Sequence, residues 1–465
     1  MKTEFTLAQL ADPDIREADR ILRACVHCGF CTATCPTYVE LGDELDSPRG
    51  RIYLLKEMLE TERTPTADTV KHIDRCLSCL ACMTTCPSGV HYMHLVDQGR
   101  VWIERRYRRP WLDRLMRSLL AAVLPRPDLF RAGLIGARVA RALLAPFGVS
   151  DARPSRTRKQ GDPSSDFMSR IKAMLALAPK RIPPREGGPR VVAAAAPRRG
   201  RVVLLQGCAQ QVLAPAINAA AISLLTRHGI EVVLAAGEGC CGSLTHHMGR
   251  DDDALMRARH NIDVWTDVAA ADDIDAILVT TSGCGTTIKD YGYVLREDQA
   301  YAAKAAQISR LAKDITEYAA GLSLGFPSTQ SELVVAYHAA CSLQHGQKIT
   351  TLPKELLSKS GFVVKDIAEG HLCCGSAGTY NILQPHLAGR LRERKIANIE
   401  QVKPDVIAAG NIGCIVQIDS GMRGCGHPVP IMHTIELLDW ATGGPKPEAM
   451  RDIVARKMAD ATEPG

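Results

Sequence analysis

The feature that most constrains this chain is a run of cysteines that occurs twice near its start. Each run has the form Cys-x2-Cys-x2-Cys-x3-Cys-Pro; the first begins at Cys25 and the second at Cys76. In such runs three thiolates bind one iron–sulfur cubane, and the fourth, before proline, reaches the other cluster. The pattern therefore predicts two 4Fe-4S clusters with crossed ligands. The predicted ligands are Cys25, Cys28, Cys31 and Cys86 for cluster 1, and Cys76, Cys79, Cys82 and Cys35 for cluster 2.

Structural zinc is the alternative for these eight cysteines. A zinc site needs only four ligands, often as two CxxC pairs. It gives no reason for the third cysteine and the proline of each run, so the spacing favours iron–sulfur clusters.

The length and the cysteine content limit the class of protein. The chain has 465 residues, and at about 150 residues per domain we expect about three domains. The polar start predicts no secretion signal, and no run of about 18 apolar residues predicts a membrane-spanning helix. Seventeen cysteines without an export signal indicate a reducing compartment, in which clustered cysteines usually bind metal.

Positive charge is concentrated in residues 100–199, which hold 23 Lys and Arg against seven Asp and Glu, a net charge of +16. Over 102–148, arginines, aromatic residues and apolar residues follow a helical spacing. Such helices can lie on an anionic membrane surface, or they can pack on the protein or a neighbouring subunit; the pattern leaves both open. No nucleic-acid-binding motif accompanies the charge, so no nucleic acid is expected as a partner. Residues 151–199 have the composition of a mobile linker.

A second set of cysteines is duplicated in the rest of the chain. The spacing is 133 residues from Cys208 to Cys341 and 130 residues from Cys284 to Cys414. Strands are predicted before the cysteines, over 202–206, 231–234 and 276–281 in the first copy and over 333–337, 362–366 and 406–409 in the second. The two sets are Cys208, Cys240, Cys241 and Cys284, and Cys341, Cys373, Cys374 and Cys414.

Strands that alternate with helices predict small parallel sheets, whose ligands lie beyond the carboxyl ends of the strands. Each set of four thiols should therefore converge on a metal centre, which is either an additional iron–sulfur cluster or zinc. Nearby histidines are each expected to be packed or hydrogen-bonded rather than ligands. These are His246, His247, His338, His345 and His371. No glycine-rich dinucleotide loop is present, so the chain is not expected to hold NAD or flavin.

The predicted fold is α+β and multidomain. A helical two-cluster ferredoxin-like domain is expected over residues 1–100, and basic amphipathic helices with a linker over 101–199. Two α/β halves with small parallel sheets are expected over 200–330 and 331–465.

Several segments resemble the iron-sulfur subunit of bacterial glycolate oxidase. They are ILRACVHCGFCTATCPTY, DRCLSCLACMTTCPSGVHY, QGCAQ, GCCG, SGCG and HLCCGSAGTYNIL. The duplicated halves resemble the cysteine-rich CCG domain of heterodisulfide reductases and of anaerobic glycerol-3-phosphate dehydrogenase. The fullest form of that motif ends in CxxC, whereas neither Cys284 nor Cys414 is followed by the final cysteine. This departure favours a four-thiolate centre over a five-thiol noncubane cluster.

The resemblance implies an electron-transfer subunit that works with flavoprotein subunits, which oxidise glycolate to glyoxylate, and that passes electrons to a membrane quinone. With the basic region, it leads us to expect peripheral attachment to the cytoplasmic side of the inner membrane. The flavoprotein partner selects the substrate, so lactate, glycerol 3-phosphate or another 2-hydroxy acid is an alternative. A thiol-disulfide reductase and a structural zinc scaffold are the alternatives from other classes.

Overall fold

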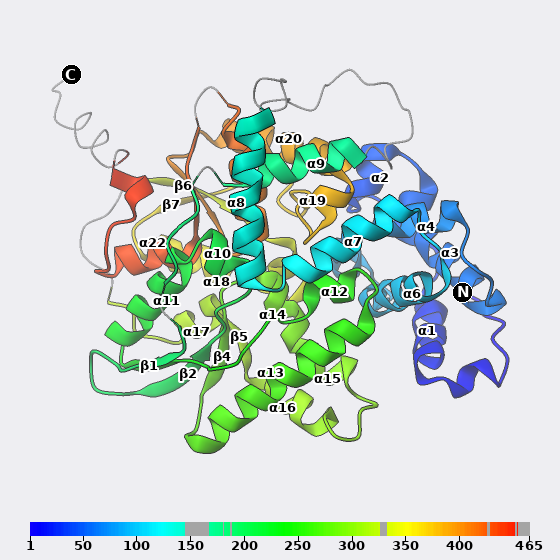
Figure 1. Cartoon of the computed structure of the whole chain (residues 1–465), viewed down its shortest axis with the longest axis horizontal. Helices are drawn as coiled ribbons and strands as arrows, with labels where there is room; N and C mark the ends of the chain where they lie inside the picture. Colours follow the sequence, from blue (N-terminus) through cyan, green and yellow to red (C-terminus); the bar gives the residue numbers. More distant parts are fainter. Residues whose placement is uncertain are drawn as a thin grey trace.

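The computed structural model describes residues 1–144, 167–179, 181–186, 188–325, 333–425, 428–451 and 453. A helical amino-terminal part lies beside two sheets with flanking helices, and three further helices cross one surface (Figure 1). The predicted fold class is confirmed: a helical cysteine-rich region precedes two α/β halves with small, mainly parallel sheets.

The amino-terminal part is built from six helices around one apolar core, which includes Ile21, Leu55 and Leu95. Three of the helices begin at a proline whose preceding residue is extended, as suits proline at the first helical position. The helices are α1 (Pro13–Ala24), α2 (Pro36–Leu41), α3 (Pro48–Thr61), α4 (Ala67–Asp74), α5 (Ala81–Thr85) and α6 (Tyr92–Arg106), with short turns η1 (Gln9–Ala11) and η2 (Glu44–Asp46).

The first sheet has the strand order β1-β3-β2-β4-β5. Its first strand pairs antiparallel with β3, and the other pairs are parallel. The strands are β1 (Arg190–Val192), β2 (Gly200–Leu204), β3 (Ile230–Leu234), β4 (Ala276–Val279) and β5 (Ala312–Asp314). The helices of this half are α10 (Gln210–Leu213), α11 (Ala216–Arg227), α12 (Ser243–His247), α13 (Asp251–Ala271), α14 (Ser282–Lys289), α15 (Tyr291–Val294), α16 (Ala302–Leu311) and α17 (Ile315–Ala320).

The second sheet is parallel throughout, in the order β7-β6-β8-β9, and repeats the order β3-β2-β4-β5 of the first. Its strands are β6 (Val334–His338), β7 (Val363–Asp366), β8 (Val406–Ala409) and β9 (Ile431–His433). Its helices are α18 (Leu352–Lys359), α19 (Tyr380–Leu383), α20 (Pro385–Val402), α21 (Ile412–Met422) and α22 (Thr434–Ala441), with turns η4 (Ser342–Gly346) and η5 (Glu448–Met450). The six strands predicted before the cysteines are therefore all present, as β2, β3, β4, β6, β7 and β8.

The two halves pack against each other through a shared apolar core. Leu204 and Leu278 of the first sheet belong to the same buried cluster as Val335 and Ala408 of the second. Helix α11 contacts α22, and α17 contacts α18. The halves therefore form one module, with its thiol-bearing loops at the carboxyl ends of the strands.

Three surface helices follow: α7 (Trp111–Val123) and α8 (Pro127–Leu144), where the sequence predicts helices, and α9 (Phe167–Leu177), which lies within the predicted linker. Residues 151–166 of the predicted linker lie outside the described residues. Within 167–199, however, α9 contacts α19, α20 and α21, and β1 adds an edge to the first sheet. The linker interpretation is therefore wrong for these two segments, because tertiary packing orders a composition that is typical of linkers. Among the described residues no helix is long and apolar enough to span a membrane.

Candidate metal centres

The four cysteines predicted to hold cluster 1 line a single pocket. Cys25, Cys28 and Cys31 come from the loop after α1, and Cys86 enters from the end of α5. The loop turns through left-handed backbone conformations at His27 (φ 56°) and Gly29 (φ 87°). A Cβ atom at Gly29 would lie 2.8 Å from Arg49 Nη1, so glycine allows the chain to wrap tightly here.

The cysteines predicted for cluster 2 also lie near one another. Burial, and then the charges of neighbouring thiols that include Cys35 and Cys76, raises the pKa values of Cys79 and Cys82 well above the usual range. Several thiolates share a dry site only if a cation compensates them, and the iron of a cluster supplies that charge. The structure thus brings together the four cysteines of each predicted cluster, and these thiols fit a 4Fe-4S cluster. Which cysteine binds which cluster stays a prediction.

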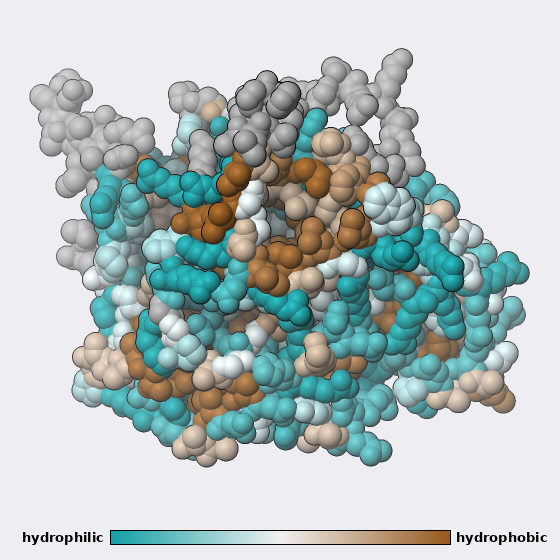
Figure 2. Space-filling model, viewed as in Figure 1, coloured by the Kyte–Doolittle hydropathy of each residue, from teal (hydrophilic) through white to brown (hydrophobic). Residues whose placement is uncertain are grey.

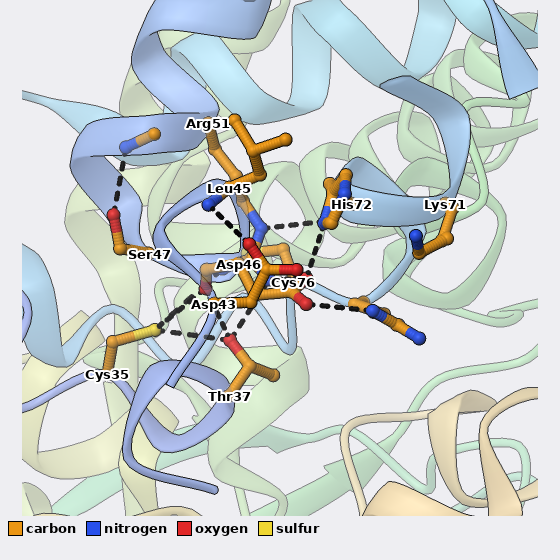
Figure 3. Close-up of polar contacts among 12 residues, drawn as sticks. Cys35, Thr37, Asp43, Leu45, Asp46, Ser47, Arg51, Lys71, His72 and Cys76 are labelled. Carbon is orange, nitrogen blue, oxygen red and sulfur yellow. Dashed lines mark hydrogen bonds and ion pairs between the residues drawn. The ribbon is translucent and has the colours of Figure 1, made fainter. Parts of the chain in front are cut away.

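A buried arginine lies directly beside the cysteines predicted to hold cluster 2. Arg51 is 1% exposed, and its Nη1 donates to Cys35 Sγ at 3.8 Å. The other guanidinium nitrogens donate to Thr37 Oγ1 at 3.0 Å, to Asp46 Oδ1 at 3.2 Å and to the carbonyl of His72 at 2.7 Å (Figure 3). Burial alone would lower the pKa of Arg51, but the negative groups around it raise the pKa above its usual value. Arg51 therefore remains a cation that faces a predicted cluster ligand.

Asp46 forms a buried ion pair with this arginine. It is fully buried, and its oxygens lie 3.2 Å from Arg51 Nη2, 2.8 Å from Arg75 Nη1 and 3.0 Å from His72 Nδ1. Burial alone would raise the pKa of Asp46, but the His72 hydrogen bond and the two arginine charges hold it below its usual value. Asp43, Asp46 and His72 bring together atoms that can bind metal, yet both Asp46 oxygens already pair with arginines. We therefore assign these residues to an ion-pair network that supports the cluster.

The sequence patterns predicted no role for Arg51. Ser47 caps α3, because its Oγ accepts from Gly50 N at 2.9 Å. The signal that could have identified Arg51 is its place one turn before Leu55, on the face of α3 that is buried in the core. A second donor was also missed: Tyr92 Oη donates to Cys76 Sγ at 3.7 Å.

The first duplicated set converges as predicted. Cys208 Sγ lies 3.6 Å from Cys240 Sγ, and the neighbouring thiols Cys240 and Cys284 both raise the pKa of Cys241. These thiol contacts lower the pKa of Cys240 and raise that of Cys241. Gly242 has φ 85°, and a Cβ there would lie 2.9 Å from the Ala254 carbonyl oxygen, so the kinked loop requires glycine.

The second set repeats this geometry. Cys341 Sγ lies 3.9 Å from Cys373 Sγ, and the neighbouring thiols Cys373 and Cys414 both act on the pKa of Cys374. Gly375 has φ 89°, and a Cβ there would lie 2.7 Å from the Ala388 carbonyl oxygen. Four thiols in each half can hold a four-coordinate zinc ion or an iron–sulfur cluster.

The second set and the predicted cluster 2 are neighbours. Cys79 and Cys373 belong to one buried apolar cluster, on which Cys341 also packs. Thr84 of α5 hydrogen-bonds His345 Nδ1 at 2.7 Å across the same junction. The helical part therefore docks its second cysteine run on the thiols of the second half.

Most of the histidines near the cysteines behave as predicted. His246 pairs with Asp97 at 3.4 Å and with Asp251 at 3.7 Å, and His247 lies 3.5 Å from Asp97. His345 hydrogen-bonds Thr84 and the carbonyl of His371. His338 is also buried, and neither of its ring nitrogens has a hydrogen-bond partner within the described part of the chain.

Comparison with family models matches both cysteine-rich regions. The model of the 4Fe-4S dicluster domain matches residues 21–90, and that of the Cysteine-rich domain matches residues 202–289 and 335–419. Among solved structures, a hypothetical protein from Helicobacter pylori matches with a TM-score of 0.51 at 10% identity, over 95% of this chain and 74% of that one. This likeness supports the fold alone.

Curated relatives match over nearly the full length. The chain is 41% identical to the glycolate oxidase iron-sulfur subunit of Escherichia coli K12, over 95% of this chain and 99% of that protein. It is 29% identical to a probable glycolate oxidase iron-sulfur subunit of Bacillus subtilis 168, with the same coverage. Lactate utilization protein A of an Exiguobacterium strain is 25% identical but matches only 51% of this chain. The full-length similarity agrees with the two cysteine runs and the duplicated thiol sets: the chain belongs to the family of glycolate oxidase iron-sulfur subunits and is an iron–sulfur protein of electron transfer.

Proposed function

We propose that this chain is the electron-relay subunit of a complex in which flavoprotein subunits oxidise glycolate to glyoxylate and a membrane quinone accepts the electrons. The observation that carries the proposal is the continuity of the thiol sets. Cys82 lines the cluster 1 pocket and lies among the cluster 2 cysteines, and Cys79 of the latter packs with Cys373 of the second half. Three thiol sets thus adjoin one another in succession, from the partly exposed cluster 1 pocket to the buried thiols of the second half.

The surrounding residues suit such a relay. An iron–sulfur cluster, when bound, supplies one-electron transfer at a potential set by hydrogen bonds, charge and solvent exposure. Arg51 and Tyr92 each donate to a cysteine sulfur of the cluster 2 set, and donation to a thiolate stabilises negative charge on it. Apolar packing around Cys79 and Cys373 excludes water from the junction. In this proposal glycolate is oxidised on the flavoprotein subunits, so the relay requires no substrate site on this chain.

The test uses the purified complex with glycolate and two acceptors: a soluble quinone analogue, and a dye that takes electrons directly from flavin. We expect Cys373→Ala to abolish quinone reduction while dye reduction persists. Cys425→Ala, at a cysteine outside both duplicated sets, should leave both rates unchanged. Normal quinone reduction by Cys373→Ala, in a preparation that has lost the iron of the second half, would refute the relay.

The substrate assignment has its own test, because the partner selects the substrate. Glycolate is favoured because the glycolate oxidase relatives match 95% of the chain, whereas lactate utilization protein A matches 51%. The same complex should reduce the dye faster with glycolate than with D-lactate, L-lactate or glycerol 3-phosphate. A higher kcat/KM with any of these would reassign the substrate and leave the relay intact.

We also propose that the complex attaches to the cytoplasmic face of the inner membrane through α7 and α8. Trp111, Leu115 and Leu119 recur every four residues on α7 and are 66%, 53% and 48% exposed. Apolar side chains gather over this region on the face drawn in Figure 2, and Leu129, Ile135 and Val139 extend the surface along α8. Exposed arginines interleave with them at positions 114, 126 and 138. Apolar side chains flanked by arginines suit the interface of an anionic bilayer.

Vesicle flotation of the complex tests this attachment. Binding should be stronger to anionic than to zwitterionic vesicles, and salt should weaken it. The double variant Trp111→Ser with Leu115→Ser should lose binding, whereas Met256→Ser, at a residue 55% exposed on α13, should retain it. Loss of the flavoprotein subunits from the double variant would instead identify the surface as a subunit interface.

A further inference from the structure

His338 occupies an unusual environment at the carboxyl end of β6. It is 2% exposed, and both ring nitrogens lack a hydrogen-bond partner within the described residues. A buried polar group without a partner is unfavourable, so native structures rarely retain one unless it has a role. One of its ring nitrogens and the Sγ atoms of Cys374 and Cys414 lie within 4.8 Å of one another. The imidazole therefore lies at the second thiol set with nothing else to bind.

The duplication provides an internal comparison for this position. His338 precedes Cys341 by three residues, and the residue three before Cys208 is Leu205. Leu205 is 2% exposed and packs in the same apolar cluster as Cys241. One backbone position beside the thiols thus carries an apolar side chain in the first half and an imidazole in the second. The fold does not require histidine there.

A second equivalent position also carries a different side chain in the two halves, neutral in the first and ionisable in the second. Ala254 of the first half and Ala388 of the second are equivalent, because each contacts the kinked glycine of its half. Seven residues after each alanine lies Asn261 in the first half and Lys395 in the second. Asn261 hydrogen-bonds Gly239 and Cys240 of the backbone. Lys395 is 2% exposed, and its Nζ donates to the Glu369 carbonyl at 2.9 Å. The positive charge of Lys395 favours the thiolate of Cys414, and the negative charges of Cys374 and Cys373 favour the ammonium of Lys395.

We propose that the second half holds an iron–sulfur centre in which His338 supplies a nitrogen ligand beside the thiolates, and that Lys395 offsets their negative charge. Both zinc and iron–sulfur centres can be bound by a mixture of histidine nitrogen and cysteine sulfur ligands. Iron is the choice here because the set adjoins Cys79 of cluster 2, where a redox-inactive ion would end the relay. The inference rests on the proposed relay for the choice of iron, and on the geometry alone for the ligand.

The test is pulsed electron paramagnetic resonance on the anaerobically purified, reduced full chain, made once with natural and once with ¹⁵N-labelled histidine. We expect a nitrogen coupling that changes with the label, which the clusters held by cysteine alone cannot give. The coupling should disappear in His338→Leu, which installs the residue that the first half carries at this position. It should persist in His345→Gln, at a neighbouring buried histidine whose nitrogens already bond Thr84 and His371.

Metal content separates a lost ligand from a misfolded chain. His338→Leu should lose the iron that Cys374→Ala also loses while retaining the signals of the ferredoxin-like clusters, and His338→Cys should regain iron without the nitrogen coupling. A label-insensitive spectrum, a coupling that survives in His338→Leu, or zinc in place of this iron would overturn the proposal. None of these measurements uses glycolate or quinone, so failure of the proposed reaction and failure of the ligand assignment give different results.

Discussion

Replacing Arg51 tests how the buried ion pairs hold the cluster 2 loop in place. Arg51→Met keeps much of the side-chain volume but removes the charge that faces Asp46 and the donor to Cys35 Sγ at 3.8 Å. Asp46 is fully buried, so the change leaves its carboxylate with Arg75 and His72 only. Loss of one partner from a buried pair costs about 3–5 kcal/mol. We expect the lower end, about 3 kcal/mol, because Arg75 still pairs with Asp46.

The measurement is anaerobic urea denaturation of the loaded chain, followed by circular dichroism and cluster absorbance. The matched control is Arg49→Met, two residues away, whose side chain pairs with Glu44 at 2.7 Å but is 32% exposed. An exposed pair contributes about 0–1 kcal/mol, so this variant should be nearly wild type in stability. Equal losses for the two variants would refute the argument from burial.

The same variant should alter the electronic properties of the loop. Removing a cation and a hydrogen-bond donor from the Cys35 thiolate destabilises the reduced, more negative form, so the reduction potential assigned to cluster 2 should fall. A redox titration resolves this, with the cluster 1 signal as the internal reference. A fall shared equally by both signals would mean that Arg51 acts through general unfolding rather than through Cys35.

Three other outcomes are expected. Cys35→Ser should broaden or abolish the resonance assigned to the cluster held by Cys76, Cys79 and Cys82; loss confined to the other cluster would reverse the crossed assignment. Burial alone would lower the pKa of His246, but Asp97 and Asp251 raise it to about 10. Its folded-state pKa thus exceeds the unfolded value of about 6.5, so its stabilising effect is complete below pH 6.5 and lost as the pH rises through 10; the urea midpoint of the wild type should fall over this range more than that of His246→Gln. Gly375→Ala should lower metal content by distorting the loop at φ 89°, whereas Gly378→Ala, where no atom meets the added Cβ, should do so less; equal effects would contradict the steric argument.

Local sequence patterns were sufficient for the elements that present the cysteines. Short β-branched runs such as Val202 to Leu204 end just before a cysteine, and the sheet order then carries the thiols to one edge. The convergence of each set follows from this rule together with the kinked glycine. Residues close in sequence determine these strands and the cysteines that follow them, so both could be predicted without knowledge of the tertiary packing.

Tertiary packing decided what the sequence did not predict. Helix α9 lies in a Pro-, Gly- and Arg-rich stretch, and it is held by contacts with α19, α20 and α21 that lie more than 190 residues away. Likewise β1 is a strand because Val191 and Val192 pair with β3. Arg51 and His338 are ordinary residues in the sequence, and their roles arise only from what the fold buries beside them.

The difference between the two halves bears on what maintains each site. A buried ammonium costs several kcal/mol unless negative charge compensates it, and burial accordingly lowers the pKa of Lys395. Its Nζ donates to the neutral carbonyl of Glu369, and the charges of Cys374, Cys373, the Glu369 carboxylate and Cys414 oppose that lowering. Neighbouring thiols shift the pKa values of Cys373 and Cys374 in both directions, and with burial the net effect is a pKa well above the usual range, so a bound metal would hold them as thiolates. A metal bound to the second half would therefore compensate the buried ammonium of Lys395, a requirement that Leu205 and Asn261 do not create in the first half.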